Sequence, residues 1–209
     1  SMKETVQYDN IREIEVESFG NVTWKESDEL AAGQVRIEKL EDGEDYQYRQ
    51  RGDELKILRG VYPGGKMNSI IISVSADTRL AEVSIEEKAG EFRADRIQAG
   101  ELSLEAEGAV IIARNVKADT LELDAKAGEI FCQADVAREI SVECDMGDVR
   151  LSLDGRKEDF SYEMECNAGQ ILLGGIGGQE SYDTHWEREI INPGGKWMDL
   201  ESRAGNIAV

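Results

Sequence analysis

Glycine recurs at nearly even spacing through the second half of the chain, and this repeat constrains the fold more than any other feature. The corner segments are Ala89-Gly90-Glu91-Phe92, Glu107-Gly108-Ala109-Val110, Ala127-Gly128-Glu129-Ile130, Met146-Gly147-Asp148-Val149, Ala168-Gly169-Gln170-Ile171 and Ala204-Gly205-Asn206-Ile207. Successive glycines are separated by 18, 20, 19, 22 and 36 residues. We therefore expect an all-β chain, a parallel β-solenoid with rungs of about 18–22 residues, whose last rung carries an insertion.

Between these corners the sequence alternates apolar and polar residues, which is typical of half-buried strands. One predicted inward column contains Ile85, Leu104, Leu123, Val142, Met164 and Leu200, and the other contains Phe92, Val110, Ile130, Val149, Ile171 and Ile207. A rung buries these side chains only when neighbouring rungs cover both of its faces. The stack is therefore expected to be continuous.

The first third of the chain is less regular and predicts a different module. Residues 3–75 are expected to form strands and hairpins that cap the first rung, with a turn at Arg51-Gly-Asp-Glu54. Residues 76–209 are expected to form the rungs. Within them, residues 174–197 are predicted to be an inserted hairpin or loop that covers the end of the core with Trp186 or Trp197.

The charge of the chain argues against two classes of partner. With 24 basic and 44 acidic residues, the formal net charge is −20, which repels nucleic acid phosphates and anionic lipid headgroups. No apolar run approaches the length of a bilayer span, and the first residues lack a signal-peptide pattern. We expect neither nucleic acid binding nor direct membrane insertion.

Acidic residues also fall in one outward column of the predicted rungs. This column contains Glu86, Glu105, Asp124, Glu143, Glu165 and Glu201. Like charges on neighbouring strands are destabilising, so the column needs solvation, a cation or a cationic partner. A solvated face is one interpretation. The other is binding of a cationic partner or of a divalent cation, with Glu105, Asp124, Glu143 and Glu165 as the candidate metal ligands, and no other cofactor is expected.

A second outward column contains apolar residues. We expect Arg93, Ile111, Phe131, Arg150 and Leu172 to point outward. Exposed apolar side chains in one column indicate contact with the N-terminal module or with another chain. Ile111, Phe131 and Leu172 are therefore the candidate partner-binding residues.

Two smaller groups of residues have both a chemical and a structural interpretation. In a strand, His185, Glu187 and Glu189 would share one face and could bind zinc or manganese, although a solvated hairpin face is the simpler interpretation. Cys144 and Cys166 are expected at one inward position on adjacent rungs. A disulfide and a reduced apolar pair are both open there.

Several segments together resemble a known bacterial family. They are the hairpin ending in Glu54-Leu-Lys-Ile57, the strand Ile70-Ile-Ile-Ser-Val74, the recurring Gly-Glu-Ile corners and the closing segment from Met198 to Ile207. The chain resembles the adhesin-like family of unknown function DUF4097, although Ser75-Ala76 stands where such proteins commonly have Val-Pro. The resemblance implies a β-solenoid, association with the cell envelope and no catalytic residues.

We expect no enzyme, because no basic residue recurs in register beside the carboxylates. The leading hypothesis is a non-catalytic, envelope-associated scaffold that presents flat β faces to a protein or glycan partner. A cytoplasmic or membrane-tethered regulatory module that binds a protein is the alternative, and a carbohydrate-active β-helix enzyme ranks third. An extracytoplasmic location is expected, with an anchor preceding Lys3.

Overall fold

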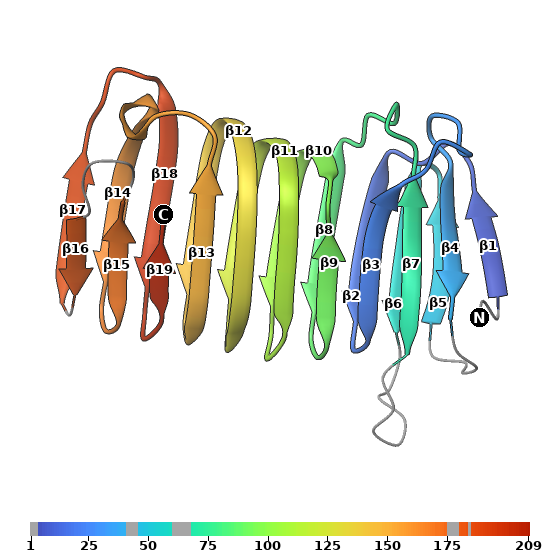
Figure 1. Ribbon diagram of the computed structural model, residues 1–209, viewed down its shortest axis with the longest axis horizontal. Coiled ribbons are helices and arrows are strands. Elements are labelled where there is room, and N and C mark those ends of the chain that lie inside the picture. Colours follow the sequence, from blue (N-terminus) through green and yellow to red (C-terminus); the bar gives the residue numbers. More distant parts are fainter. Residues whose placement is uncertain (1–3, 41–45, 60–67, 175–179, 184) are drawn as a thin grey trace.

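The computed structural model describes residues 4–40, 46–59, 68–174, 180–183 and 185–209. These residues form 19 strands and one 3-10 turn, η1 (Lys157–Asp159), so the all-β class is confirmed. The strands lie side by side along the long axis of the molecule (Figure 1). They make two layers, which β11 and β12 join because each of these long strands pairs in both layers.

Layer A contains the strands whose outward side carries the acidic column. In spatial order these are β5 (Tyr46–Arg51), β6 (Glu54–Arg59), β2 (Glu13–Ser18), β8 (Glu82–Glu87), β10 (Ile97–Ala106), the second halves of β11 (Val110–Ala125) and β12 (Gly128–Cys144), β18 (Lys196–Ser202), β14 (Phe160–Cys166) and β17 (Trp186–Ile190).

Layer B contains the strands that follow the glycine corners. In spatial order these are β1 (Glu4–Tyr8), β4 (Val35–Lys39), β7 (Ser69–Val74), β3 (Asn21–Glu26), β9 (Glu91–Ala94), the first halves of β11 and β12, β13 (Gly147–Leu153), β19 (Asn206–Ala208), β15 (Gln170–Leu173) and β16 (Glu180–Asp183).

Strand direction changes at both ends of the molecule. Pairing is parallel through the middle of each layer, from β6 to β14 in layer A and from β7 to β15 in layer B. It is antiparallel at β5–β6, β14–β17, β1–β4, β4–β7 and β15–β16. The sheet is therefore mixed rather than wholly parallel, because the strands at the ends of the stack run opposite to their neighbours; β5–β6 and β15–β16 do so as hairpins.

The core lies between the layers, and the inward column of layer A follows the sequence pattern. Leu104 pairs with Ile85 on one side and Leu123 on the other, and Leu123 pairs with Val142. Each step is 19 residues, and all four side chains are buried. The period-two alternation therefore assigned this face correctly.

In layer B the predicted register was wrong at one rung. Ile111, not Val110, pairs with Phe92 and Ile130, and it is fully buried. The reason is that Ala109, rather than Gly108, occupies the corner position equivalent to Gly128, since the amide of Glu129 donates to the Ala109 carbonyl. One extra corner residue shifts the alternation by one and exchanges the two faces.

The last rung does not stand at the end of the stack. Strands β18 and β19 lie between β12–β13 and β14–β15, so the final strand is paired on both sides. Ser202 consequently separates Cys144 from Cys166, and the cysteines are not on adjacent rungs. Cys132, Cys144 and Cys166 are all buried, and none of them forms a disulfide in the described part of the chain.

The two end regions can be compared with the predicted modules. The turn at Arg51-Gly-Asp-Glu54 is the two-residue connection of the β5–β6 hairpin, while β2 and β3 pair directly with β8 and β9. At the other end β16 and β17 are the terminal strands, and Trp186 packs against the core. Trp197 instead lies in the outward register of Glu139. The boundary at residues 75 and 76 stays a prediction, and part of the 174–197 segment lies outside the described residues.

One corner glycine is required by its surroundings. Gly147 has φ +105°, a conformation that L side chains rarely adopt, and a Cβ there would collide with the Gly128 carbonyl oxygen. Adjacent rungs therefore approach closely at this corner. None of the helices in the part of the chain that the structure describes is long and apolar enough to cross a membrane.

Candidate functional site

The acidic column of layer A is continuous in the structure. Glu86, Glu105, Asp124 and Glu143 occupy successive strands in one register. Glu201 then follows Glu143, and Glu165 follows Glu201. The candidate cation ligands Glu143 and Glu165 are thus separated by one strand, because β18 is inserted between them.

Basic side chains accompany this column, contrary to the expectation that none recurs in register. Lys88, Lys126 and Arg203 each stand two residues after a member of the column, at the corner of the rung. Lys126 Nζ lies 3.5 Å from Glu105 and 3.6 Å from Asp124. The carboxylates of neighbouring rungs are therefore bridged by cations of the chain itself.

The same arrangement holds at the two other basic corners. Lys88 Nζ is 3.0 Å from Glu17 and 3.8 Å from Glu86. Arg203 is 2.9 Å from Glu143 and 3.4 Å from Glu201. Acids and bases alternate at this corner, where Glu107 lies between Lys88 and Lys126, and Asp145 lies between Lys126 and Arg203. This corner ladder offsets much of the repulsion that the sequence predicts.

Repulsion is not cancelled everywhere. The pKa of Asp124 is raised from 3.8 to about 6, chiefly by burial; the charges of Glu143 and Glu105 contribute to this rise, and Lys126 opposes it. Burial, followed by the charge of Glu105, also raises the pKa of Glu86. The Asp124 side chain is 19% exposed, and its Oδ1 has no hydrogen-bond partner in the described part of the chain. Asp124 therefore combines a strongly raised pKa with a carboxylate oxygen that no described group satisfies.

The residues that could approach a cation most closely differ from the predicted set. Ligand atoms of Glu86, Glu105 and Glu107 lie within 4.8 Å of one another. This group shares only Glu105 with the predicted ligands. A metal role for Glu105, Asp124, Glu143 and Glu165 stays a prediction.

The predicted histidine site does not form as one strand face. His185 has φ +59° and lies in a bend before β17, whereas Glu187 and Glu189 belong to β17. His185 therefore has left-handed backbone outside the strand and does not take part in the alternation of β17. The buried thiols are also poor ligands or nucleophiles, because burial raises the pKa of Cys132 to about 12 and that of Cys144 to about 11.

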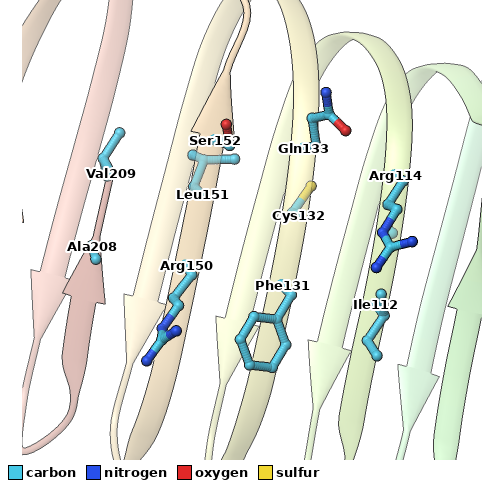
Figure 2. A pocket seen from close by; sticks show the side chains of 11 residues that line it. Ile112, Arg114, Phe131, Cys132, Gln133, Arg150, Leu151, Ser152, Ala208 and Val209 are labelled. Carbon is cyan, nitrogen blue, oxygen red and sulfur yellow. The ribbon is translucent and has the colours of Figure 1, made fainter. Parts of the chain in front are cut away.

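Layer B carries a groove of a different character. Its volume is about 560 Å³, and it runs across β11, β12, β13 and β19. The lining residues are Ile112, Ala113, Arg114, Phe131, Cys132, Gln133, Arg150, Leu151, Ser152, Ala208 and Val209. Figure 2 shows Phe131 between Ile112 and Arg150, with Arg114, Gln133 and Ser152 in a second row.

The alternation of strands positions these side chains. Ile112, Phe131 and Arg150 are one residue beyond the buried Ile111, Ile130 and Val149, and they occupy a single outward register. The Arg150 guanidinium carbon lies 5.6 Å from the centre of the Phe131 ring, within cation–π range. Phe131 is half-buried, while Arg114, Gln133 and Arg150 are exposed.

The groove brings together some predicted partner-binding residues and omits others. Phe131 lies at its centre, and Leu172 is half-buried beside Ala208 in the same outward register. Ile111 was wrongly placed, since it is buried and Ile112 takes the outward position. Arg114 was missed, although a strand alternation continued from Ile112 would have placed it on this face.

The groove has the features of a binding surface for an anionic chain. Aromatic and arginine side chains are enriched where proteins bind partners. Two exposed arginines line this groove, so it offers an anion more positive charge than the acidic column of layer A does. The groove therefore combines an apolar centre, exposed guanidinium groups and hydrogen-bonding side chains.

Several solved structures are similar to this chain. One is a "putative cell adhesion protein" from Clostridium sporogenes ATCC 15579, with 13% identity, a TM-score of 0.44, and coverage of 100% of this chain and 98% of that one. A "putative adhesin" from Bacteroides fragilis NCTC 9343 has 12% identity, a TM-score of 0.34, and coverage of 98% and 95%. A "putative adhesin" from Parabacteroides merdae ATCC 43184 has 10% identity, a TM-score of 0.38, and coverage of 100% and 95%.

No curated protein matches the sequence. A family model does match, and it covers residues 11–209, which include every strand from β2 to β19. The match extends from the first rung to the last and includes both layers. The chain therefore belongs to the family described as Toastrack DUF4097.

Proposed function

We propose that this chain is a non-catalytic, adhesin-like β-solenoid scaffold that binds an anionic segment of a protein or glycan partner in the groove of layer B. In this proposal residues 3–75 cap one end of the stack. The location is extracytoplasmic, at the cell envelope.

One observation carries the proposal. Phe131 is held half-exposed in the outward face of a rigid sheet, with Arg150 over its ring and Arg114 on the next strand. Exposed aromatic rings are uncommon on a face that contacts only solvent. Aromatic and arginine side chains are typical of the centre of a binding surface. A carboxylate-rich chain carries negative charge that complements these arginines.

The binding experiment compares two anionic probes with a neutral one. Oligogalacturonate serves as the acidic glycan, oligoglutamate as the acidic peptide, and dextran oligosaccharides as the neutral glycan, with binding measured by calorimetry. The wild-type chain should bind at least one anionic probe. The double variant Arg114→Ala with Arg150→Ala should weaken that binding at least about tenfold, and a tenfold loss corresponds to about 1.4 kcal/mol.

The matched control removes two arginines outside the groove. Arg96→Ala with Arg138→Ala changes the net charge equally, and both side chains are exposed. This control should bind like the wild-type chain. Equal weakening in both double variants, or equal binding of dextran, would contradict the proposal.

A further inference from the structure

Layer A carries opposite charges at its two ends. One outward register runs through the whole layer, in the order Arg49, Lys56, Glu15, Ser84, Ser103, Glu122, Ser141, Asp199, Glu163 and Glu189. It begins with two basic residues and ends with three acidic residues. The terminal strands thus have complementary charge in one register.

Neighbouring residues strengthen this difference. Arg51 accompanies Arg49 on β5, and Glu187 accompanies Glu189 on β17. All four side chains are exposed. Arg49 and Arg51 also line a depression with Glu54 and Lys56. The exposed charge on β5 is therefore positive, and Glu187 and Glu189 outnumber the cation Arg188 on β17.

Both ends also leave core side chains partly uncovered. At the first end Val6, Tyr8 and Tyr48 pack against the core but remain partly exposed. At the other end Trp186 and Ile190 also pack against the core while remaining partly exposed, and Ile191 is 66% exposed. Apolar surface of this kind at the end of a stack favours covering by another layer of strands.

The terminal strands of layer A are edge strands that run in compatible directions. Among the described residues β5 pairs with β6 alone and β17 pairs with β14 alone. Each runs opposite to the parallel strands of layer A, so β5 and β17 run in the same direction. An edge strand with unpaired backbone groups is a template for pairing with a second chain.

We propose that copies of this chain associate head to tail, with β5 of one copy beside β17 of the next. Continuing the layer A register places Arg49 opposite Glu189 of the second copy. Two heads or two tails would oppose like charges and repel. The contact joins different surfaces of the two copies, so it generates an open chain of molecules rather than a closed dimer. It does not depend on what the groove binds.

Charge reversal at one end tests the contact. The head variant carries Arg49→Glu with Arg51→Glu, and the tail variant carries Glu187→Arg with Glu189→Arg. In sedimentation velocity, the average sedimentation coefficient of the wild-type chain should rise with concentration. Each variant alone has like charges at both ends, so this rise should be lost.

Mixing the two variants restores complementarity. The acidic head of one variant then meets the basic tail of the other, and a basic head meets an acidic tail. The equimolar mixture should recover the concentration-dependent rise that each variant lacks. A misfolded variant cannot produce this recovery, so loss of folding and loss of charge complementarity are distinguished.

Matched reversals away from the ends serve as controls. Glu101→Arg with Glu139→Arg changes the charge as the tail variant does, in the middle of layer A, and Arg96→Glu with Arg138→Glu matches the head variant. Both should associate like the wild-type chain. A wild-type chain that stays monomeric at every concentration, a variant that associates normally alone, or a mixture that stays monomeric would each overturn the proposal.

Discussion

The two layers share one construction but use their outward residues differently. In layer A, Lys126 contacts carboxylates on its own rung and on the neighbouring rung, so its charge is largely used within the chain. In layer B, Arg114 and Arg150 are exposed beside Phe131. Cations that are used for folding are unavailable to a partner, while cations that stand apart are available. The comparison predicts that substitutions in the corner ladder of layer A change stability and that those in the groove change binding.

The largest expected effect tests the corrected register of layer B. Ile111→Ala should lower the free energy of unfolding by about 2–5 kcal/mol, because a buried aliphatic side chain is replaced by a cavity. Ile112→Ala, which truncates its half-buried neighbour in the groove, should cost about 1 kcal/mol or less. Urea denaturation of both variants measures the difference. Equal losses would show that the groove face is part of the core.

The register correction also shows how far the sequence alone could predict this molecule. The inward column from Ile85 to Val142 was predictable, because burial alternates within a strand whatever its neighbours are. The shift at Ile111 was not, since an extra corner residue looks like ordinary variation in rung length. The position of β18 between β12 and β14 is a non-local choice that no local pattern encodes.

Some charged residues of layer A were predicted from the sequence, and others were not. The acidic column was predictable from the same alternation. The corner cations Lys88, Lys126 and Arg203 were also visible, two residues beyond alternate members of that column, but they were overlooked because they occupy the corner instead of the strand. The groove was found only in part, because Phe131 was correctly faced while the neighbouring strand was shifted by one residue.

The next effect concerns Asp124. Its pKa is raised to about 6 in the folded chain, from 3.8, so the folded state binds more protons between these values. Stability therefore falls as pH rises through this window, and ionised Asp124 destabilises the fold at pH 7. Asp124→Asn should raise the free energy of unfolding at pH 7 by about 1–2 kcal/mol. The shift sets a ceiling of about 3 kcal/mol, and loss of the Lys126 pair offsets part of it.

The pH dependence makes this prediction specific. At pH values below the unfolded pKa the wild-type Asp124 is protonated in both states, so the gain from Asp124→Asn should disappear. Glu122→Gln, at an exposed position of the same strand, should stay within about 0.5 kcal/mol at every pH. A gain that persists unchanged in acid would point to packing rather than to charge.

A smaller effect is expected from the cation of the corner ladder. Lys126→Met should lower the free energy of unfolding by about 0.5–1 kcal/mol at pH 7, because Glu105 and Asp124 then face each other without their bridging charge. It should also raise the pKa of Asp124 above its wild-type value, which an NMR titration measures. Lys117→Met, at an exposed position elsewhere on β11, should leave that pKa unchanged. If both lysine variants behave alike, the ladder does not organise layer A.

The smallest expected effect separates the two layers most directly. Arg150→Ala removes the guanidinium group over Phe131, and because Arg150 is exposed, this cation–π contact should contribute about 0.5 kcal/mol, the lower end of the usual range. Stability should therefore fall by about 0.5 kcal/mol or less, while binding of an anionic probe weakens far more. Urea denaturation and calorimetry on one preparation measure the two changes. For Arg150→Ala the loss of binding should exceed the loss of stability, and for Lys126→Met the loss of stability should exceed the loss of binding. If Arg150→Ala instead destabilises the chain as much as Lys126→Met and leaves binding intact, the arginines of layer B serve the fold in the same way as the cations of layer A.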